Sequence, residues 1–377
     1  MSQMPATTTL APQRKLADQP AAWLIGLAGV EAPVIRIESD TRPLEASVLN
    51  LPPPFTRLPS DAPLDWQEDW TIESSLGPLE SQWPDANRSL GVFRPGSSEP
   101  FCWTFETLSA EECVLWLEDE RAGARAFMHV DLRRRRILLR EDKAQSRWLS
   151  RMVRNIHAAY LVHTGWQPLH ACAFPAGGRI VVCIGQRGAG KSTLSYLAAQ
   201  RAGGFFADDM VLIRPTDDGE CKVLGWPGRL AVRRKVLEQT LGAAHTKDIE
   251  PRLRRGLAQS HGHPRGDRFA FDHDEIAPLL GIDYVTMRKA PLRIARIEAH
   301  AGYPELSPWT LGGLHTEDLS HGRDRRHFTD LVGFYRGTPS AVEHDSLIKS
   351  IQAEVSRMQM PFDLTEHFDN LWQHLVG

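Results

Sequence analysis

One stretch, residues 180–200, constrains the fold of this chain more than any other. Residues 180–184 form an uninterrupted apolar run, typical of a buried strand, and residues 193–200 read as a helix. Between them, GQRGAGKS at 185–192 fits the pattern G-x-x-x-x-G-K-[ST]. A glycine-rich loop in this context turns backbone N–H groups toward an anion, and the helix adds the positive end of its dipole. The sequence therefore predicts a site for a nucleoside triphosphate.

Nine consecutive residues are assigned to this site: Gly185, Gln186, Arg187, Gly188, Ala189, Gly190, Lys191, Ser192 and Thr193. Lys191 is expected to reach the β- and γ-phosphates, and the Ser192 hydroxyl to bind Mg²⁺. ATP, or another nucleoside triphosphate, and Mg²⁺ are thus the predicted cofactors. A glycine-rich turn that binds nothing is the alternative, but it leaves the agreement between motif and context unexplained.

The bulk composition is that of an ordinary globular protein. The 377 residues suggest two domains, and 42% hydrophobic with 24% charged residues is typical of soluble chains. The net charge of −3 gives no reason to expect a nucleic acid or membrane partner. Five cysteines, an odd number lying mostly in apolar runs, indicate reduced thiols. With no signal peptide at the start and residues 21–30 too short to span a bilayer, we expect a cytoplasmic protein.

The first part of the chain is expected to be rich in strands. Residues 1–20 are polar and expected to be disordered, and frequent prolines disfavour helices up to about residue 116. Eight of the eleven tryptophans precede residue 170, and we expect them to pack in a β-rich core rather than line a binding groove. The four arginines at 133–136 are interpreted as a solvated turn or strand edge, with an anion site as the alternative. Strands are predicted at 101–105, 113–117 and 126–130, followed by a turn and a strand over 131–140.

The hydrophobic period changes near residue 144, which we take as a domain boundary. The expected domains are an N-terminal α+β domain at 21–144, a domain carrying the loop at 145–338, and C-terminal helices at 339–377. Helical spacing predicts helices over 146–164, 317–335 and 340–358, and from about residue 364. Residues 246–267 are predicted to form a long loop. Strands are predicted at 168–174, 180–184, 205–213, 222–226, 230–232 and 290–299, with a hairpin turn at 175–179.

Two adjacent acids, Asp208 and Asp209, interrupt the apolar run at 205–213. Neighbouring strand side chains point to opposite faces, and a buried carboxylate needs a partner or takes up a proton. Lys191 and a bound Mg²⁺ are the natural partners, with one aspartate holding the metal and the other accepting the proton of an attacking hydroxyl. The residues do not decide which acid has which role. A turn with two exposed acids is the alternative.

His170 lies in the strand predicted to pair with residues 180–184, which would bring it near the phosphates. A structural histidine beside an apolar run is the alternative interpretation.

Three elements together resemble a known family. Leu169-His-Ala171, the loop at 185–193 and Phe206-Ala-Asp-Asp209 are similar, in order and spacing, to the catalytic domain of HPr kinase/phosphorylase and related bacterial kinases. The double acid is also similar to phosphoenolpyruvate carboxykinase, which shares that fold. The resemblance covers roughly residues 145–300. It implies an α/β fold in which a P-loop mixed-sheet catalytic domain follows a β-rich α+β domain and precedes a short helical tail.

The resemblance also implies roles and partners. Residues 185–193 would bind the triphosphate, and Ser192, Asp208 and Asp209 would hold Mg²⁺. The catalytic set would be Lys191, Asp208, Asp209 and His170, with one aspartate and His170 managing the proton of a serine-like hydroxyl. HPr kinases are hexameric, so a homo-oligomer is implied.

The chain also departs from the family. It has no counterpart of the signature Leu-Glu-(Ile/Val)-Arg-Gly, so the reverse reaction, phosphorolysis, is not implied. The N-terminal domain has no match, and substrate recognition is assigned to it. A phosphate-clamping arginine is expected among Arg229, Arg233, Arg265 and Arg268, without a choice between them.

The leading hypothesis is a kinase that transfers the γ-phosphoryl group of ATP to a hydroxyl, expected to be serine, of a peptide or protein. A small-molecule kinase, a plain ATPase and a nucleotide-sensing module without catalysis are the alternatives. Because binding alone needs no base, the acid pair favours chemistry.

Overall fold

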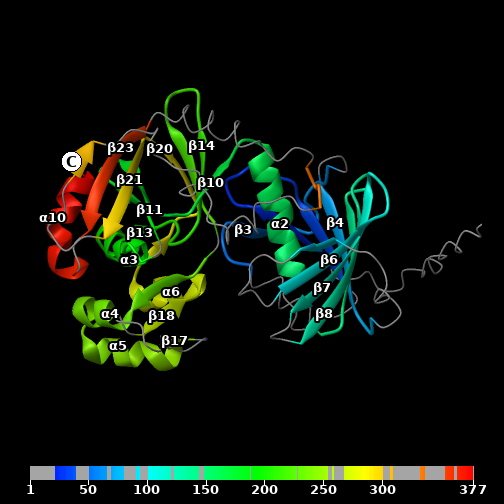
Figure 1. The fold of residues 1–377 in the computed structure, drawn as a ribbon, viewed down its shortest axis with the longest axis horizontal. Coiled ribbons are helices and arrows are strands. Elements are labelled where there is room, and N and C mark those ends of the chain that lie inside the picture. The colour runs from blue at the N-terminus through cyan, green and yellow to red at the C-terminus, as the bar shows by residue number, and fades with distance from the viewer. Residues whose placement is uncertain are drawn as a thin grey trace, which may run out of the picture.

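The computed structural model describes residues 22–39, 51–65, 69–79, 91–93, 101–119, 123–143, 148–186, 188–226, 228–253, 257–258, 267–299, 306–308, 332–335, 353–360 and 363–376. Over these residues the fold is mixed α/β, mostly strands with several helices (Figure 1). The predicted α/β class is confirmed at this level. The disorder predicted for residues 1–20 lies outside the described residues.

Nine strands from the first part of the chain form one sheet, in the order β3-β1-β2-β4-β9-β8-β7-β6-β5. β2, β4 and β9 pair in parallel and the other neighbours pair antiparallel, so the sheet is mixed. The strands predicted between residues 101 and 140 are confirmed. The bounds are Ala22–Leu27 (β1), Ile35–Ser39 (β2), Phe55–Leu58 (β3), Trp70–Leu76 (β4), Gly91–Phe93 (β5), Phe101–Thr107 (β6), Glu112–Asp119 (β7), Ala124–Asp131 (β8) and Arg136–Glu141 (β9).

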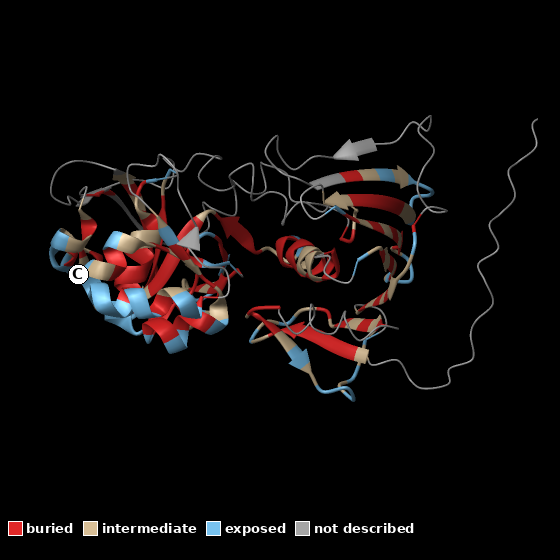
Figure 2. Ribbon diagram, turned by 90° about the horizontal axis from the view of Figure 1, so that it is seen from below, coloured by how far each residue is buried: buried red, intermediate tan, exposed pale blue. Residues whose placement is uncertain are grey.

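Helix α2, Trp148–His163, covers one face of this sheet and confirms the helix predicted there (Figure 1). Because strand side chains alternate between faces, every second residue of the central strands points toward α2. Most of α2 is buried (Figure 2). The expected tryptophan core is present, since this cluster contains Trp23, Trp70, Trp103, Trp148 and Trp166.

The same core extends beyond the nine-stranded sheet. It also includes Met210, Leu212, Leu224 and Trp226 from the second half of the chain. α2 therefore belongs to a core to which both halves contribute. The domain boundary near residue 144 stays a prediction.

A five-stranded sheet carries the glycine-rich loop, in the order β11-β12-β21-β23-β22. β12, β21 and β23 are parallel, and β11 and β22 are antiparallel to their neighbours. The predicted hairpin before the loop is confirmed, with Gly177 and Gly178 at positive φ in its turn. The bounds are Ala171–Ala176 (β11), Arg179–Ile184 (β12), Leu292–Ala299 (β21), Leu306–Pro308 (β22) and Ala353–Met360 (β23).

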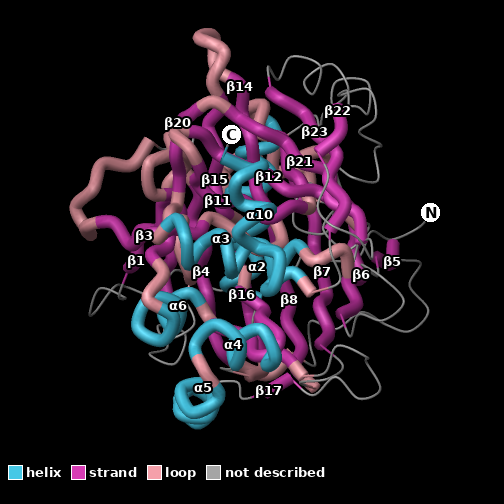
Figure 3. The backbone as a smooth tube through the Cα atoms, turned by 90° about the vertical axis from the view of Figure 1, so that its left-hand side faces the viewer, coloured by secondary structure: helices cyan, strands magenta, loops and turns pink. Residues whose placement is uncertain are grey.

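Two helices pack against this sheet. Helix α3, Lys191–Ala202, follows the loop, and helix α10, Leu364–Val376, confirms the predicted last helix. They lie side by side in Figure 3, and Arg201 of α3 pairs with Asp369 of α10 at 3.0 Å.

Three smaller sheets complete the second half, in the orders β10-β14-β15-β20, β13-β19 and β16-β18-β17. The strands predicted at 222–226 and 230–232 are confirmed as β15 and β16, and the one at 290–299 as β21. The remaining bounds are Gln167–Leu169 (β10), Gly204–Phe205 (β13), Val211–Pro215 (β14), Cys221–Gly225 (β15), Leu230–Arg233 (β16), Leu257–Ala258 (β17), Arg268–Phe271 (β18), Asp283–Tyr284 (β19), Met287–Ala290 (β20), Arg234–Leu241 (α4), Ala243–Ile249 (α5), the 3₁₀ helix Glu250–Arg252 (η2) and His273–Leu280 (α6).

Two predicted strands are interrupted. The strand predicted over 168–174 is divided at His170 into β10, which pairs with β14, and β11, which pairs with β12. The strand predicted over 205–213 is divided into β13 and β14 by a bend at the two acids. The bend buries Asp208 and exposes Asp209, which relieves the conflict of two neighbouring carboxylates in an apolar strand.

The loop predicted over 246–267 is wrong at its start, where α5 continues to Ile249 and η2 follows. Ile249 is fully buried, and its packing in the core stabilises a helix that the polar sequence of this segment does not predict. Residues 254–256 and 259–266 lie outside the described part of the chain.

The helix predicted over 340–358 is wrong where it is described, because β23 occupies residues 353–360. β23 lies between β21 and β22, so its backbone bonds are made within the sheet and its position overrides helical propensity. Of the helix predicted over 317–335, only 332–335 are described, and these residues are not helical. The C-terminal segment is therefore not purely helical.

No disulfide forms among the cysteines whose side chains are described, in agreement with the expected reduced thiols. These cysteines are Cys113, Cys172, Cys183 and Cys221. Among the described residues, no helix has the length and apolar character needed to cross a bilayer.

Candidate functional site

The glycine-rich loop at 185–193 connects the carboxyl end of β12 to the start of α3. Gly188 and Gly190 have φ values of 88° and 103°, which non-glycine residues rarely adopt, and Gly190 is the N-cap of α3. At Gly185 a Cβ atom would lie 2.4 Å from the carbonyl oxygen of Ile297 in β21. The glycines are therefore required by the turn and by the close approach of a neighbouring strand.

Lys191 is the first residue of α3 and its side chain is buried. Its Nζ donates hydrogen bonds to the carbonyl oxygens of Gly185, at 2.6 Å, and Gln186, at 3.3 Å. The ammonium group thus lies over the first residues of the loop, next to the N-terminal end of α3. This arrangement concentrates positive charge where the helix dipole is also positive.

The other loop residues surround this position. Gln186 and Gly188 are exposed, Ala189 is buried, and Ser192 and Thr193 are half-buried in the first turn of α3. Arg187 lies outside the described residues. Eight of the nine residues predicted to bind nucleotide are therefore described, and they lie on either side of Arg187 in the loop and in the first turn of α3.

Asp208 lies in the bend between β13 and β14, and its side chain is buried beside the loop. Its Oδ2 accepts a hydrogen bond from the backbone N–H of Ala231 at 3.1 Å. Its Oδ1 is buried without a hydrogen-bond partner of normal length and angle. α3 packs against the same bend, where the Ser195 hydroxyl donates to the carbonyl oxygen of Ala207 at 3.4 Å.

Burial raises the pKa of Asp208 to about 7, and the charge of Asp209 adds to this shift. The Ala231 N–H, the Ser192 hydroxyl and Lys191 oppose it by favouring the charged form. Two residues of the loop, Ser192 and Lys191, therefore act on the charge of Asp208, so the acid pair and the loop are electrostatically coupled.

Asp209 points the other way. Its side chain is 59% exposed, and its Oδ1 lies 3.5 Å from Nδ1 of His170, whose side chain is only 14% exposed. The Asp209 carbonyl oxygen also accepts a hydrogen bond from Ala171 N–H at 3.1 Å, which fixes the bend against β11. His170 precedes β11 rather than lying within it, but the structure brings it to the acid pair.

The oxygen atoms of Asp208 and Ser192 could bind Mg²⁺ only if a nucleotide supplied further ligands. No group of three or more His, Cys, Asp or Glu side chains in the described part of the chain is arranged to hold a metal. Mg²⁺, however, usually takes one or two protein carboxylates and completes its shell with water and phosphate oxygens. The buried Oδ1 of Asp208, with the Ser192 hydroxyl nearby, fits that pattern.

Sequence reasoning missed some neighbours of this site. The Ala231 N–H that holds Asp208 is a backbone group and leaves no sequence signal. Cys172 and Cys183 are fully buried and directly opposite each other in β11 and β12. Burial, the neighbouring thiol and the charge of Asp208 raise the pKa of Cys172 well above its usual value, so the thiol stays protonated. The sequence does contain a signal for this pair of cysteines, because each lies in one of two strands that are predicted to pair.

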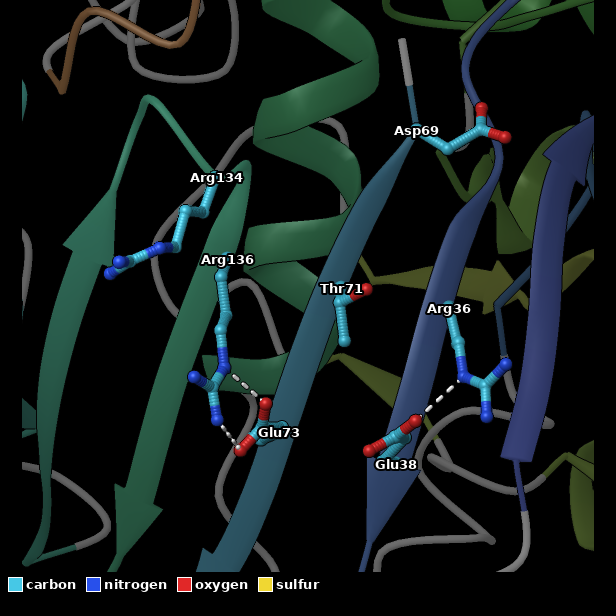
Figure 4. A pocket seen from close by; sticks show the side chains of 7 residues that line it. All are labelled: Arg36, Glu38, Asp69, Thr71, Glu73, Arg134 and Arg136. Carbon is cyan, nitrogen blue, oxygen red and sulfur yellow. Dashed lines mark hydrogen bonds and ion pairs between the residues drawn. The ribbon is translucent and has the colours of Figure 1, made fainter. Parts of the chain in front are cut away.

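A second feature lies on the outer face of the nine-stranded sheet, away from the loop. It is a shallow cavity of about 340 Å³, shown in Figure 4 and lined by Arg36, Glu38, Asp69, Thr71, Glu73, Arg134 and Arg136. Arg36 pairs with Glu38 at 2.6 Å and Arg136 binds both oxygens of Glu73. Arg134 of the predicted solvated turn pairs with Asp131 at 3.1 Å. Because each arginine already has a carboxylate partner, the cavity offers no unbalanced charge to a ligand.

No protein-family model matches this chain, and a search of the curated proteins also finds no match. The chemistry of the loop and of the acids beside it is therefore the basis for a functional proposal.

Proposed function

We propose that this chain is a kinase that transfers the γ-phosphoryl group of ATP, or of another nucleoside triphosphate, to a hydroxyl group. The observation that carries the proposal is the position of Asp208, buried next to Lys191 and Ser192, with Asp209 and His170 adjacent. A nucleotide cradle and a carboxylate pair side by side are what phosphoryl transfer requires. The proposed catalytic fold is a P-loop mixed sheet like that of HPr kinase and phosphoenolpyruvate carboxykinase.

The loop is the proposed donor half of the active site. Its backbone N–H groups and the N-terminal end of α3 would bind the phosphate oxygens, and Lys191 would exchange its carbonyl partners for them. Mg²⁺, held by Ser192 and Asp208 with Asp209 close by, would neutralise charge on the triphosphate. The protein's own contribution is to hold the γ-phosphoryl group in line with an acceptor.

The two aspartates are proposed to have different roles, one in binding the metal and the other in accepting a proton. Asp208 is buried and held by Ala231, so it is suited to orient Ser192 and the metal. Asp209 is exposed and contacts His170, so an acceptor hydroxyl can reach it. Asp209 is therefore the proposed base, and His170 positions its carboxylate.

The acceptor is proposed to be a serine-like hydroxyl on a peptide or protein. Support comes from the resemblance of residues 145–300 to HPr kinase, together with an acid that is open to solvent. A homo-oligomeric state is proposed on the same resemblance, and a cytoplasmic location on the free thiols of the described cysteines.

The test combines γ-labelled ATP with the protein and a lysate of the host from which the sequence comes. We expect label on an acceptor with the wild-type protein, and at least a hundredfold less with Lys191→Ala or Asp209→Asn. Asp209→Asn should still bind nucleotide, whereas Lys191→Ala should not. Arg201→Gln, an exposed change on the far end of α3, is the matched control.

Two results contradict the proposal. If tight nucleotide binding leaves every acceptor unlabelled, the chain is a nucleotide-sensing module. If folded Asp209→Asn and Asp208→Asn both transfer at the wild-type rate, the acid pair is not the active site.

A further inference from the structure

The backbone around Asp208 is held by β11 on both sides of the acid. The N–H of Ala173 donates to the carbonyl oxygen of Ala207 at 3.0 Å, and the N–H of Ala171 donates to that of Asp209 at 3.1 Å. Both neighbours of Asp208 are therefore bound to a strand of the sheet that carries the loop. With the backbone fixed, the groups that surround the carboxylate decide what it can bind.

Strand β16 supplies the group that contacts this carboxylate. It is an edge strand of its three-stranded sheet, and its residues Leu230 and Val232 are fully buried in a core that also includes residues of α3. Ala231 lies between them, and its backbone N–H donates to Oδ2 of Asp208 at 3.1 Å. The position of this N–H is thus set by the packing of a strand next to the helix that follows the loop.

The two oxygens of Asp208 therefore differ. Oδ2 is engaged by a backbone N–H, which cannot rotate away as a hydroxyl can. Oδ1 is buried without a hydrogen-bond partner of normal length and angle. The residue is only 7% exposed, and a carboxylate oxygen removed from water without a partner is costly. Oδ1 is thus the oxygen that remains for a cation.

Divalent cations differ in what they require of a carboxylate. Mg²⁺ is small and octahedral, keeps several waters, and takes one or two carboxylates together with phosphate oxygens. Ca²⁺ takes about six to eight oxygens at longer distances, and a carboxylate often gives it both of its oxygens. Groups that hold a metal ligand from behind fix its orientation and change metal affinity. A carboxylate with one oxygen already engaged therefore favours Mg²⁺.

We infer that the backbone N–H of Ala231 makes the site selective for Mg²⁺ over Ca²⁺, because it leaves Asp208 a single oxygen for the metal. The inference rests on the proposed function, since it concerns the cation that accompanies the nucleotide there. Ala231 is a positioning residue that acts through Asp208. Its side chain has no part in this role, so the sequence carries no sign of it.

The experiment measures binding of a non-hydrolysable ATP analogue by calorimetry, with either Mg²⁺ or Ca²⁺ as the only divalent cation. The ratio of the two dissociation constants reports selectivity without any catalytic step. For the wild-type protein we expect binding to be at least about tenfold tighter with Mg²⁺. Equal affinity with the two cations overturns the inference.

The decisive variant has lactic acid in place of Ala231, inserted by nonsense suppression. It exchanges the N–H for an oxygen atom and keeps the methyl side chain. We expect the selectivity ratio to fall by at least about tenfold, mainly through weaker binding with Mg²⁺. Alanine inserted at the same position by the same route is the matched control and should keep the wild-type ratio. An unchanged ratio in the ester variant overturns the inference.

Lactic acid in place of Ala270 separates this role from a structural one. Ala270 lies opposite Ala231 in β18, and its N–H is not the one bound to Asp208. If Ala231 acts through Asp208, the ester at Ala270 keeps the wild-type ratio. If both esters lower the ratio equally, the effect comes from a weakened sheet, and the inference is wrong.

Hydrogen exchange of the wild-type Ala231 amide tests the same bond without any substitution. We expect this amide to exchange slowly in the complex with Mg²⁺ and the analogue, because its bond to Asp208 persists there. Exchange at the rate of an unbonded amide in that complex contradicts the inference.

The two proposals fail separately. Selectivity that is lost in the Ala231 ester, without any labelled acceptor for the wild-type protein, supports the role of Ala231 and contradicts the kinase. Labelled acceptor for the wild-type protein, with an unchanged ratio in the ester, supports the kinase and contradicts the role of Ala231.

Discussion

At Gly185 the absence of a single carbon atom allows the loop to leave the sheet. A Cβ there would lie 2.4 Å from the Ile297 carbonyl oxygen, a distance no real contact adopts, and backbone cannot move aside as a flexible side chain does. We therefore expect Gly185→Ala to destabilise the protein by about 1–3 kcal/mol and to displace the start of the loop. Denaturant unfolding and nucleotide titration measure the two effects.

Gly178 provides the matched control for Gly185→Ala. Unlike Gly185 it has a positive φ, of 79°, and a Cβ added there meets nothing within 4 Å. Gly178→Ala should cost about 1 kcal/mol through backbone strain and leave nucleotide affinity unchanged. Equal nucleotide affinity in Gly185→Ala and Gly178→Ala would show that the close approach to β21 does not shape the loop.

At the scale of elements, α10 is attached to the five-stranded sheet through a buried arginine. Nη1 of Arg293, in β21, donates to the carbonyl oxygens of His374 at 2.8 Å and Leu375 at 3.0 Å, which are among the last carbonyls of α10. A helix end leaves such carbonyls without internal partners, and a cation there also complements the dipole.

We expect Arg293→Met to destabilise α10 by about 1.5–3 kcal/mol, because charge-assisted bonds to buried carbonyls are lost. Hydrogen exchange should show faster exchange in α10 and little change in the nine-stranded sheet. Arg296→Met, on the same strand, removes an ion pair with Glu298 at 3.3 Å near the surface, and should cost less than about 1 kcal/mol. Uniform acceleration across the whole protein would argue against a local attachment.

The elements that the sequence predicted well are those in which several signals agree. Residues 180–193 combine an apolar run, glycines and a helix start, and β12, the loop and α3 follow them closely. The helical period of residues 148–163 identified α2 because one face of it is buried. The proximity of the candidate residues was also predictable in outline, since Asp208 lies beside the loop and Asp209 contacts His170.

The elements that it did not predict depend on distant partners. Residues 353–360 contain good helix formers, yet they form β23 because β21 and β22 lie on either side. The bend that separates buried Asp208 from exposed Asp209 depends on Ala231, more than twenty residues away.

At the scale of the whole molecule, the core between the nine-stranded sheet and α2 contains one acid, Glu141, that makes stability depend on pH. Its side chain is fully buried, and neither oxygen has a hydrogen-bond partner of normal length and angle. Burial raises its pKa from 4.5 to about 8, Asp142 adds to the shift, and the backbone N–H of Trp148 opposes it.

The raised pKa of Glu141 means that the folded state holds a proton that the unfolded state releases above pH 4.5. Its contribution to stability is therefore complete below pH 4.5 and is lost as the pH rises to about 8, a loss on the order of 5 kcal/mol. We expect Glu141→Gln to remove this slope in urea unfolding measured from pH 5 to 8. Glu111→Gln, at an exposed position, should leave the slope intact. A wild-type slope in Glu141→Gln would assign the pH dependence to other groups.

The order of strands in the five-stranded sheet has a consequence for synthesis on the ribosome. Every strand of the nine-stranded sheet lies within residues 22–141, so that sheet can pair before the rest of the chain is made. The sheet that carries the loop is different, because β21 is covered on its far side by β23, whose last residue, Met360, reaches the loop glycine Gly190. The strands of the first sheet can thus pair while the sheet that carries the loop is still unfinished, and their shared core is completed only by later residues such as Trp226. The proposed nucleotide site is complete only when nearly all of the chain has been translated.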